Sequence, residues 1–254
     1  MGNFLSDKSA QWDESHRLWP LPDIPWIITQ TWNNLLFAHY PVDLKVLQSL
    51  IPDKLTLDTY NGTGWVGIVA FRITGSRVRG VPPLPGMANF PEINVRTYVT
   101  IDEKPGVYFL SMDASNILVV GGARTLYHLP YVTSEMKVDY NHPFIKYKSN
   151  RLDNCGAALN CSYRPISDPY NAPASSFEKW MAERYCLYTV NKRGELRRCD
   201  ILHQPWLLQK AEANISLNTM LSSQGIPVES DKPILHFSKK KKVRMWPLVN
   251  PFER

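Results

Sequence analysis

The most informative segment of the 254-residue sequence reads Phe90-Pro91-Glu92-Ile93-Asn94-Val95-Arg96-Thr97-Tyr98-Val99. Its polar and apolar side chains alternate, as they do in a β-strand, where successive residues face opposite sides. Ile93, Val95 and Thr97 share one side, and Glu92, Asn94, Arg96 and Tyr98 share the other. The polar side either faces water or lines a pocket, and the alternation by itself favours water.

A pocket would give this polar side a chemical role. Glu92 and Arg96 stand four residues apart, roughly 13 Å along a strand, which is too far for a direct pair but suits two walls of a small-molecule cavity. Arg96 would bind an anionic group there, because a guanidinium forms charge-assisted hydrogen bonds with carboxylates. Asn94 and Tyr98 would supply further contacts to the ligand.

Segments of strand character continue on both sides of this one, and turn residues recur about every ten residues, which is typical of antiparallel sheets. The Asn61-Gly62 pair predicts a hairpin between 55–59 and 65–72. The predicted fold class is α+β, a mainly antiparallel, barrel-like single domain. Further strands are expected at about 31–39, 92–100, 106–112, 133–140, 145–151, 157–163, 185–190, 195–203 and 234–246, with 207–215 a strand or a short helix.

Three short helices are predicted from caps and periodicity. Asp43 would cap a helix at 44–50, Ser115 one reaching about Tyr127, and a Ser175–Glu178 capping box one ending near 184. Gly121 and Gly122 weaken the second helix, which suggests that another part of the molecule packs closely there. Residues 1–25, rich in Trp and Pro, are expected to form an N-terminal extension over a single domain at 26–254.

The positive charge is concentrated at one end of the chain. The formal net charge is +6, from 29 Lys+Arg and 23 Asp+Glu. Residues 239–254 contain Lys239, Lys240, Lys241, Lys242, Arg244, Arg254 and Glu253, so this stretch supplies +5 and the remainder +1. We interpret the lysine run as part of an edge strand protected from pairing, in preference to a nucleic-acid-binding tract.

Several other classes lack support in the sequence. No apolar stretch approaches the roughly 18 residues of a membrane span, and no signal peptide is evident, so we expect a cytoplasmic protein without membrane contact. Four scattered cysteines favour neither a disulfide framework nor a zinc site. The Gly62–Gly67 match to a dinucleotide motif precedes a strand instead of a helix. We therefore predict no metal and no cofactor.

Two further clusters carry chemistry-bearing side chains. Asp113 ends one predicted strand, and Arg124, His128 and Tyr131 follow at helical spacing. Ordinary helix ends would give the same pattern. Tyr185 lies in a predicted strand, and His203 precedes Pro205-Trp206. A histidine beside a tryptophan is more often structural than catalytic. All of these residues are candidate ligand contacts.

Multi-residue motifs from about residue 26 to 247 resemble, in order, the YqjF-like family of uncharacterised bacterial proteins. These motifs are Trp32–Asp43, Pro82–Gly86, Phe90–Val99, Gly106–Phe109, Leu129–Tyr131, Glu183–Tyr188 and Pro205-Trp206. The resemblance implies an acetoacetate decarboxylase-like fold, a closed, cone-like antiparallel sheet around an internal cavity. It implies no established activity.

The same resemblance suggests a change of chemistry. In the decarboxylases, a lysine that forms a Schiff base follows a Gly-Phe-Pro-like turn, and the similar stretch here is His128-Leu129-Pro130-Tyr131. A phenol cannot form an imine, so Schiff-base decarboxylation should be lost. Glu92 resembles the acidic residue of the decarboxylase cavity. We predict general acid–base catalysis through Glu92, Tyr131 or a histidine, acting on a small organic acid or aromatic compound.

Two other functions remain open at this stage. The chain could be a non-catalytic ligand-sensing or structural protein on a degenerate decarboxylase scaffold, or, with weaker support, a nucleic-acid-associated protein that uses the lysine run. A homo-oligomer is compatible with the sequence. The expected partner is a small-molecule ligand, with no nucleic acid and no membrane.

Overall fold

The computed structural model describes residues 12–141, 143–227 and 232–253. Within them the elements follow in the order β1 (Ile28–Val42), α1 (Leu44–Leu50), β2 (Thr56–Leu57), β3 (Gly64–Val78), β4 (Phe90–Ile101), β5 (Lys104–Ala114), α2 (Ile117–Leu126), β6 (Tyr131–Asp139), β7 (Ile145–Arg151), β8 (Ala158–Pro165), β9 (Tyr170–Asn171), α3 (Phe177–Ala182), β10 (Cys186–Val190), β11 (Leu196–Leu202), β12 (Leu207–Asn218), a short 3₁₀ turn (Ser222–Gln224) and β13 (Ile234–Met245). The predicted α+β class, mainly antiparallel with a few short helices, is confirmed.

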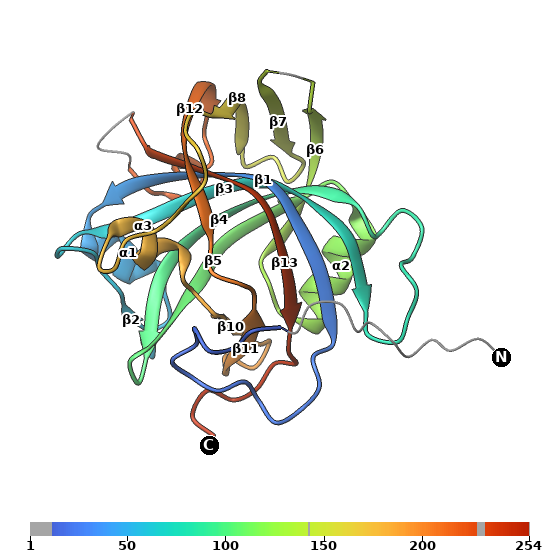
Figure 1. The fold of residues 1–254 in the computed structure, drawn as a ribbon, viewed down its shortest axis with the longest axis vertical. Helices are drawn as coiled ribbons and strands as arrows, with labels where there is room; N and C mark the ends of the chain where they lie inside the picture. Colours follow the sequence, from blue (N-terminus) through green and yellow to red (C-terminus); the bar gives the residue numbers. More distant parts are fainter. Residues whose placement is uncertain (1–11, 142, 228–231, 254) are drawn as a thin grey trace.

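Strands of one connected sheet close into a ring. β4 pairs with β3, β3 with β1, β1 with β13, β13 with β11, β11 with β10, β10 with β5, and β5 returns to β4. The β5–β10 and β5–β6 pairings are parallel, and the other pairings in the sheet are antiparallel. Figure 1 shows the long, twisted strands β1, β3, β4 and β13 on one side of this ring.

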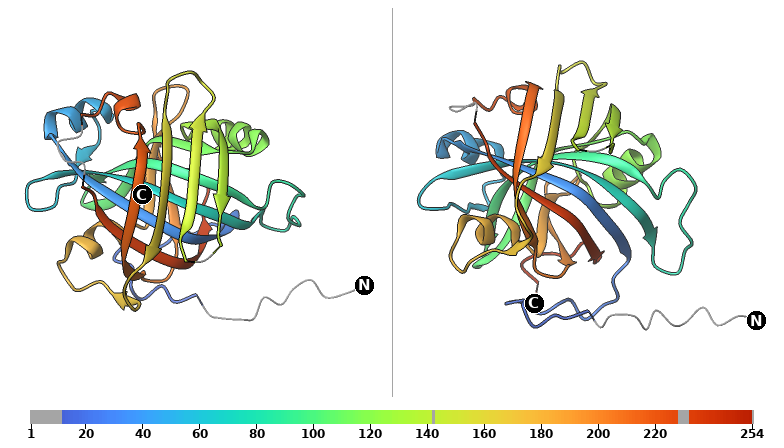
Figure 2. Two further views of the ribbon diagram at one scale, coloured as in Figure 1. Left: turned by 90° about the horizontal axis from the view of Figure 1, so that it is seen from above. Right: turned by 45° about the horizontal axis from the view of Figure 1, so that its top comes forward.

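The remaining strands form a second layer. β6, β7, β8 and β12 continue the sheet from β5, and β12 returns to pair with β13. Figure 2 shows β7, β8 and β12 crossing over the strands of the ring. Buried side chains therefore form one core inside the ring and another between the two layers.

The alternation in β4 has the predicted period, and both of its faces are buried. Ile93 and Val95 pack between the layers, against Tyr147 of β7. The polar face, with Glu92 and Asn94, turns into the ring, where both side chains are buried. The tendency of an alternating strand to expose its polar face is therefore not followed here, because ring closure encloses that face.

The strand that carries the lysine run is not an edge strand of the sheet, although Lys240–Lys242 themselves pair with β1 alone. β13 lies inside the sheet, paired with β1 on one side and with β11 and β12 on the other. Lys239, Lys240 and Lys242 are exposed, whereas Lys241 turns inward and is buried. Its ammonium group donates to the carbonyl oxygens of Gln204 and Pro205 at 3.0 and 2.7 Å.

Local turn and cap predictions hold in part. Asp43 caps α1, but Asn116, not Ser115, caps α2, and Ser176 caps α3 in place of a Ser175 capping box. Asn61-Gly62 forms the turn, yet β2 pairs with β4 instead of β3. The predicted pairing of 55–59 with 65–72 is therefore wrong: the turn closes only a Tyr60–Thr63 bridge, and β3 pairs with β1 and β4.

Residues 12–25 run along the end of the ring outside the sheet. The Arg17 guanidinium donates to the carbonyl oxygen of Ile201 in β11, and the Trp246 indole donates to the carbonyl oxygen of Ile24. Within the described residues, no helix has the length and apolar character needed to cross a membrane.

Candidate functional site

A cavity of about 60 Å³ lies within the ring of strands. Glu92, Asn94 and Arg96 line it from β4, and Tyr131 lines it from the first position of β6. The β5–β6 pairing places Tyr131 beside Met112, which brings it to the wall next to β4. Apolar side chains complete the lining: Trp32, Leu35, Phe37, Val69, Phe71, Phe109, Met112, Leu129, Leu187, Ile201, Trp206 and Met245, together with Gln30.

Glu92 and Tyr131 form a buried hydrogen-bonded pair. The Tyr131 hydroxyl donates to Glu92 Oε2 at 2.6 Å, and Glu92 is only 2% exposed. Burial raises the pKa of the Glu92 carboxyl from 4.5 to about 7, although the hydrogen bonds from Tyr131 and Asn94 oppose this shift. Burial and the neighbouring Glu92 carboxyl raise the pKa of Tyr131 well above 10. Near neutral pH, Glu92 can therefore either release or accept a proton.

Three polar atoms in the cavity wall have no hydrogen-bond partner among the described residues. They are Asn94 Oδ1, Arg96 Nε and Trp206 Nε1. The Arg96 guanidinium lies 5.7 Å from the centre of the Phe37 ring and has no carboxylate partner in the described chain. Buried polar groups in proteins nearly always find partners, so these atoms indicate room for a polar ligand.

Tyr98 shares the inward face of β4 but lies beyond the cavity. Its hydroxyl lies 2.5 Å from His39 Nε2, and its ring packs 4.4 Å from Trp180 between ring centres. The Arg184 guanidinium lies 5.0 Å from the Tyr98 ring centre and pairs with Asp58. Tyr98 therefore supports the end of the ring beyond Arg96 and does not line the cavity.

Five other sequence candidates lie outside the cavity. Asp113 faces the opposite side of β5 from Met112 and pairs with Arg151 of β7. Arg124 is exposed on α2, which is anchored through the buried Val120. His128 adopts a left-handed backbone conformation just before Tyr131, and its carbonyl oxygen accepts from Thr189. We therefore remove these three from the candidate site.

His203 is the fourth residue outside the cavity. It is buried between the rings of Tyr185 and Trp206, and its ring nitrogens face the carbonyl oxygens of Gln204 and Arg184. Burial lowers its pKa to about 3, so the ring stays neutral. The structural interpretation of this histidine fits its surroundings.

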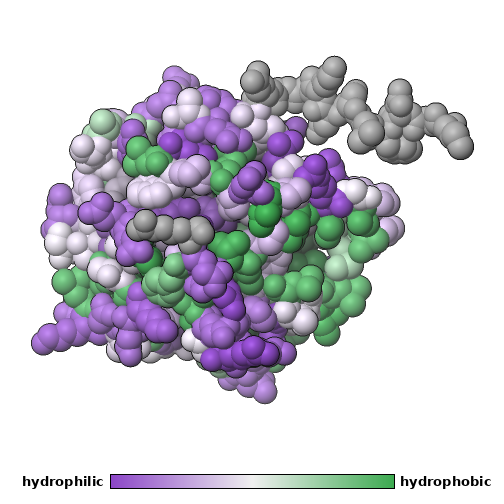
Figure 3. Space-filling view, turned by 90° about the horizontal axis from the view of Figure 1, so that it is seen from below, coloured by the Kyte–Doolittle hydropathy of each residue, from purple (hydrophilic) through white to green (hydrophobic). Residues whose placement is uncertain are grey.

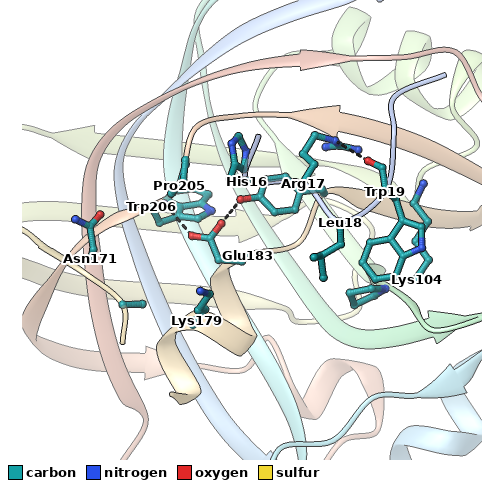
Figure 4. Close-up of a pocket in the computed structure, with 13 residues that line it drawn as sticks. His16, Arg17, Leu18, Trp19, Lys104, Asn171, Lys179, Glu183, Pro205 and Trp206 are labelled. Atoms are coloured by element: carbon teal, nitrogen blue, oxygen red, sulfur yellow. Dashed lines mark hydrogen bonds between the residues drawn. The ribbon is translucent and has the colours of Figure 1, made fainter. Parts of the chain in front are cut away.

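Tyr185 lines a larger outer pocket of about 480 Å³ beneath the N-terminal segment (Figure 4). There the Glu183 carboxylate accepts hydrogen bonds from the Tyr185 hydroxyl and the Trp206 backbone amide, and Lys104 pairs with Asp200. We favour the central cavity as the functional site because it places a carboxyl of raised pKa beside a guanidinium without a carboxylate partner, although His16 Nδ1 and Arg17 Nη2 of the outer pocket also have no hydrogen-bond partner among the described residues. Trp206 lines both spaces and forms the wall between them.

A model of a family of uncharacterized conserved proteins, DUF2071, matches residues 29–242. The chain belongs to this family. The uncharacterized protein YqjF of Bacillus subtilis (strain 168) is 49% identical over 228 residues, which cover 90% of this chain and 94% of that protein. The resemblance inferred from the sequence motifs is confirmed.

Solved structures show that this DUF2071 member has an acetoacetate decarboxylase-like fold. The acetoacetate decarboxylase of Legionella pneumophila superposes with a TM-score of 0.63 at 13% identity, over 96% of this chain and 98% of that one. The enduracididine biosynthesis enzyme MppR superposes with a TM-score of 0.62 at 9% identity, over 89% of each chain. An acetoacetate decarboxylase-like enzyme from Sphingomonas wittichii RW1 gives 0.60 at 13% identity, over 92% and 96%.

Sequence reasoning missed Trp206 and Gln30 as lining residues of the cavity. Pro205-Trp206 belongs to the motifs of the family resemblance, but the sequence indicates only that Trp206 lies near His203. Gln30 precedes the segment in which a strand was expected, so its direction could not be assigned. Among the described residues, no group of three or more His, Cys, Asp or Glu side chains is arranged to hold a metal ion.

Proposed function

We propose that this protein binds a small organic acid in the central cavity and exchanges protons with it through Glu92 and Tyr131. The observation that carries the proposal is the buried Glu92–Tyr131 pair beside unpartnered atoms of Asn94 and Arg96. An enclosed carboxyl with a pKa near 7 is suited to general acid–base work at neutral pH. A metal or redox cofactor is not needed for such proton transfer.

The positive charge of Arg96 favours an anionic ligand. Its guanidinium lies against aromatic rings with no carboxylate partner among the described residues, so the acid group of a ligand would supply the missing charge. Trp206 Nε1 and the Asn94 side chain would then contact its other polar atoms. Two of the structural neighbours are named for small organic acids, acetoacetate in one case and bound pyruvate in another. Both compounds are therefore suitable probes.

Replacement of Arg96 by Met should weaken binding of the acid probes by about ten- to a hundredfold, the worth of a hydrogen bond to a charged group. The affinities for pyruvate and acetoacetate would be measured by isothermal titration calorimetry. Arg124→Met is the matched control, because Arg124 is exposed on α2 away from the cavity. Equal affinities of Arg96→Met and the unmodified protein would contradict the proposed site.

Schiff-base chemistry is not part of the proposal. Tyr131 stands where the resemblance places the decarboxylase lysine, and the residues that line the cavity in the described chain include no lysine. Lys241, whose ammonium group lies 4.9 Å from the centre of the Trp206 ring, donates to two carbonyl oxygens, although burial lowers its pKa to about 8. Lys137 of β6 is an exposed surface residue.

Borohydride should therefore trap no covalent adduct when the protein is incubated with acetoacetate or pyruvate. Intact-protein mass spectrometry would show the unmodified mass, whereas an imine to any lysine, formed with loss of water, would be reduced to a stable amine and add the mass of the ligand less one oxygen atom. An adduct mapped to a lysine by peptide mass spectrometry would show that an amine reaches the ligand and would refute this part of the proposal.

Binding and catalysis can be separated. Proton transfer by Glu92 would exchange the methyl protons of pyruvate for deuterium in D₂O faster than solvent alone does, as followed by proton NMR. Probes that bind without any accelerated exchange would support the alternative function, a non-catalytic ligand sensor on the same scaffold.

A further inference from the structure

A second, apolar space adjoins the central cavity. A groove of about 180 Å³ runs between α2 and the loop that joins β3 to β4. Its wall is formed by Ile28, Gln30, Ser76, Arg77, Val78, Val81, Pro82, Leu84, Met87, Phe90, Leu118, Val119, Gly122, Ala123, Leu126, Tyr127, Leu129, Tyr131 and Met245. Figure 3 shows hydrophobic surface around a hollow on the side of the molecule where α2 and this loop lie in Figure 1.

The rim of the groove exposes more apolar surface than a stable fold requires. Val78, Val81, Leu84, Leu118 and Leu126 are each between 42 and 70% exposed. Single exposed hydrophobic residues are common, but a group of five around one hollow is typical of a binding surface. The fold does not require these residues to be exposed, because α2 is anchored in the core through Val120 and Tyr127.

The groove and the central cavity share part of their walls. Gln30, Leu129, Tyr131 and Met245 line both spaces. The Tyr131 ring forms part of the apolar groove, while its hydroxyl reaches Glu92 in the cavity at 2.6 Å. The outer pocket, in contrast, shares only Trp206 with the cavity. The groove therefore shares more of its wall with the acid site than the outer pocket does.

We infer that the groove holds the apolar tail of the ligand whose acid group lies beside Arg96, so that the substrate class is an organic acid with a medium-length apolar chain. This inference rests on the proposed function and adds the second half of the ligand. The polar atoms of the cavity bind the head, and Leu84, Leu118 and Leu126 cover the tail. A two- or three-carbon acid alone would leave the groove empty.

The first arm of the test measures affinity against chain length. Acetate, butanoate, hexanoate and octanoate would be titrated calorimetrically into the protein at pH 6, where Glu92 is mostly protonated. Each methylene that enters the groove should tighten binding about fourfold, until the tail outgrows the wall. Affinities that do not depend on chain length would overturn the inference.

The second arm fills the groove by mutation. Gly122 lines the groove, and a β-carbon built there meets no atom within 4 Å, so Gly122→Phe places a ring in the groove without a backbone clash. Gly121→Phe is the matched control, since that position is equally open, lies next in the same helix and does not line the groove. Both changes remove a helical glycine, so α2 should fold in each.

Gly122→Phe should weaken octanoate binding at least tenfold and change acetate binding less than twofold, whereas Gly121→Phe should change neither. An equal loss in both glycine variants would overturn the groove assignment. So would a loss of octanoate binding in Ala172→Phe, which fills the outer pocket, if Gly122→Phe retained it.

The Arg96→Met variant separates this inference from the proposed function. If Arg96→Met weakens the binding of every acid but chain length does not change the affinity, the acid site is supported and the groove assignment fails. If chain length and Gly122→Phe act as expected but Arg96→Met has no effect, the groove binds an apolar chain and the acid site is refuted, together with the head-and-tail ligand inferred here.

Discussion

Replacement of Arg151 by Met is expected to destabilise the protein by about 3–5 kcal/mol, because it leaves the Asp113 carboxylate buried without its partner. Asp113 is 0% exposed, and its carboxylate accepts hydrogen bonds from Arg151 Nη2 at 2.6 Å and from the Ser134 hydroxyl at 3.0 Å. Burial raises the pKa of Asp113 even with Arg151 present, which shows how costly this charge is. Urea denaturation at pH 7 would measure the loss.

The double variant Asp113→Asn/Arg151→Met should recover at least about 2 kcal/mol of that loss, since no buried charge is left unpaired. Arg164→Met is the surface control, because Arg164 and Glu212 form a half-exposed pair, worth less than about 1 kcal/mol. If Arg151→Met loses no more stability than Arg164→Met, the Asp113–Arg151 ion pair does not hold the second layer on the ring.

Replacement of Glu92 by Gln should stabilise the protein at alkaline pH. The pKa of Glu92 is raised from 4.5 in the unfolded chain to about 7 in the folded protein, so the folded state retains a proton that the unfolded state loses. Stability from this group is full below pH 4.5 and is lost as the pH rises towards 7. A neutral Gln removes that loss, about 3 kcal/mol at pH 8 and about 1 kcal/mol at pH 5.

Denaturation curves of the two proteins at pH 5 and pH 8 would give these differences. Glu178→Gln is the control, since Glu178 is a partly exposed residue of α3 outside the cavity. The same pair of proteins should differ in binding: affinity for an acid falls above pH 7 in the unmodified protein, where Glu92 becomes anionic, and stays level in Glu92→Gln. A stabilisation equal at both pH values would contradict a raised pKa at Glu92.

Much of the candidate site could be predicted from β4 alone. The two-residue period placed Glu92, Asn94 and Arg96 on one face, and all three line the cavity. The segment could not show whether that face meets water, because this depends on β13 and β10, which close the ring from distant parts of the chain. Tyr131 joined the candidates through a family resemblance, and its contact with Glu92 depends on the parallel β5–β6 pairing.

Two of the errors originate in pairings between distant segments. Asp113 ends the strand that carries Met112, but alternation turns it to the other layer, towards Arg151, thirty-eight residues on. The lysines of β13 look like edge protection until β1, β11 and β12 are placed on both sides of that strand. Local sequence determines the direction of a side chain relative to its neighbours, and the partner strand determines what that side chain meets.

A crystal structure of the protein soaked with its tightest-binding acid probe would test the central claim most directly. The account predicts the acid group in the central cavity, within hydrogen-bond distance of Arg96 Nε and of the Glu92–Tyr131 pair. Acid density confined to the outer pocket beneath the N-terminal segment, with an unchanged central cavity, would contradict it.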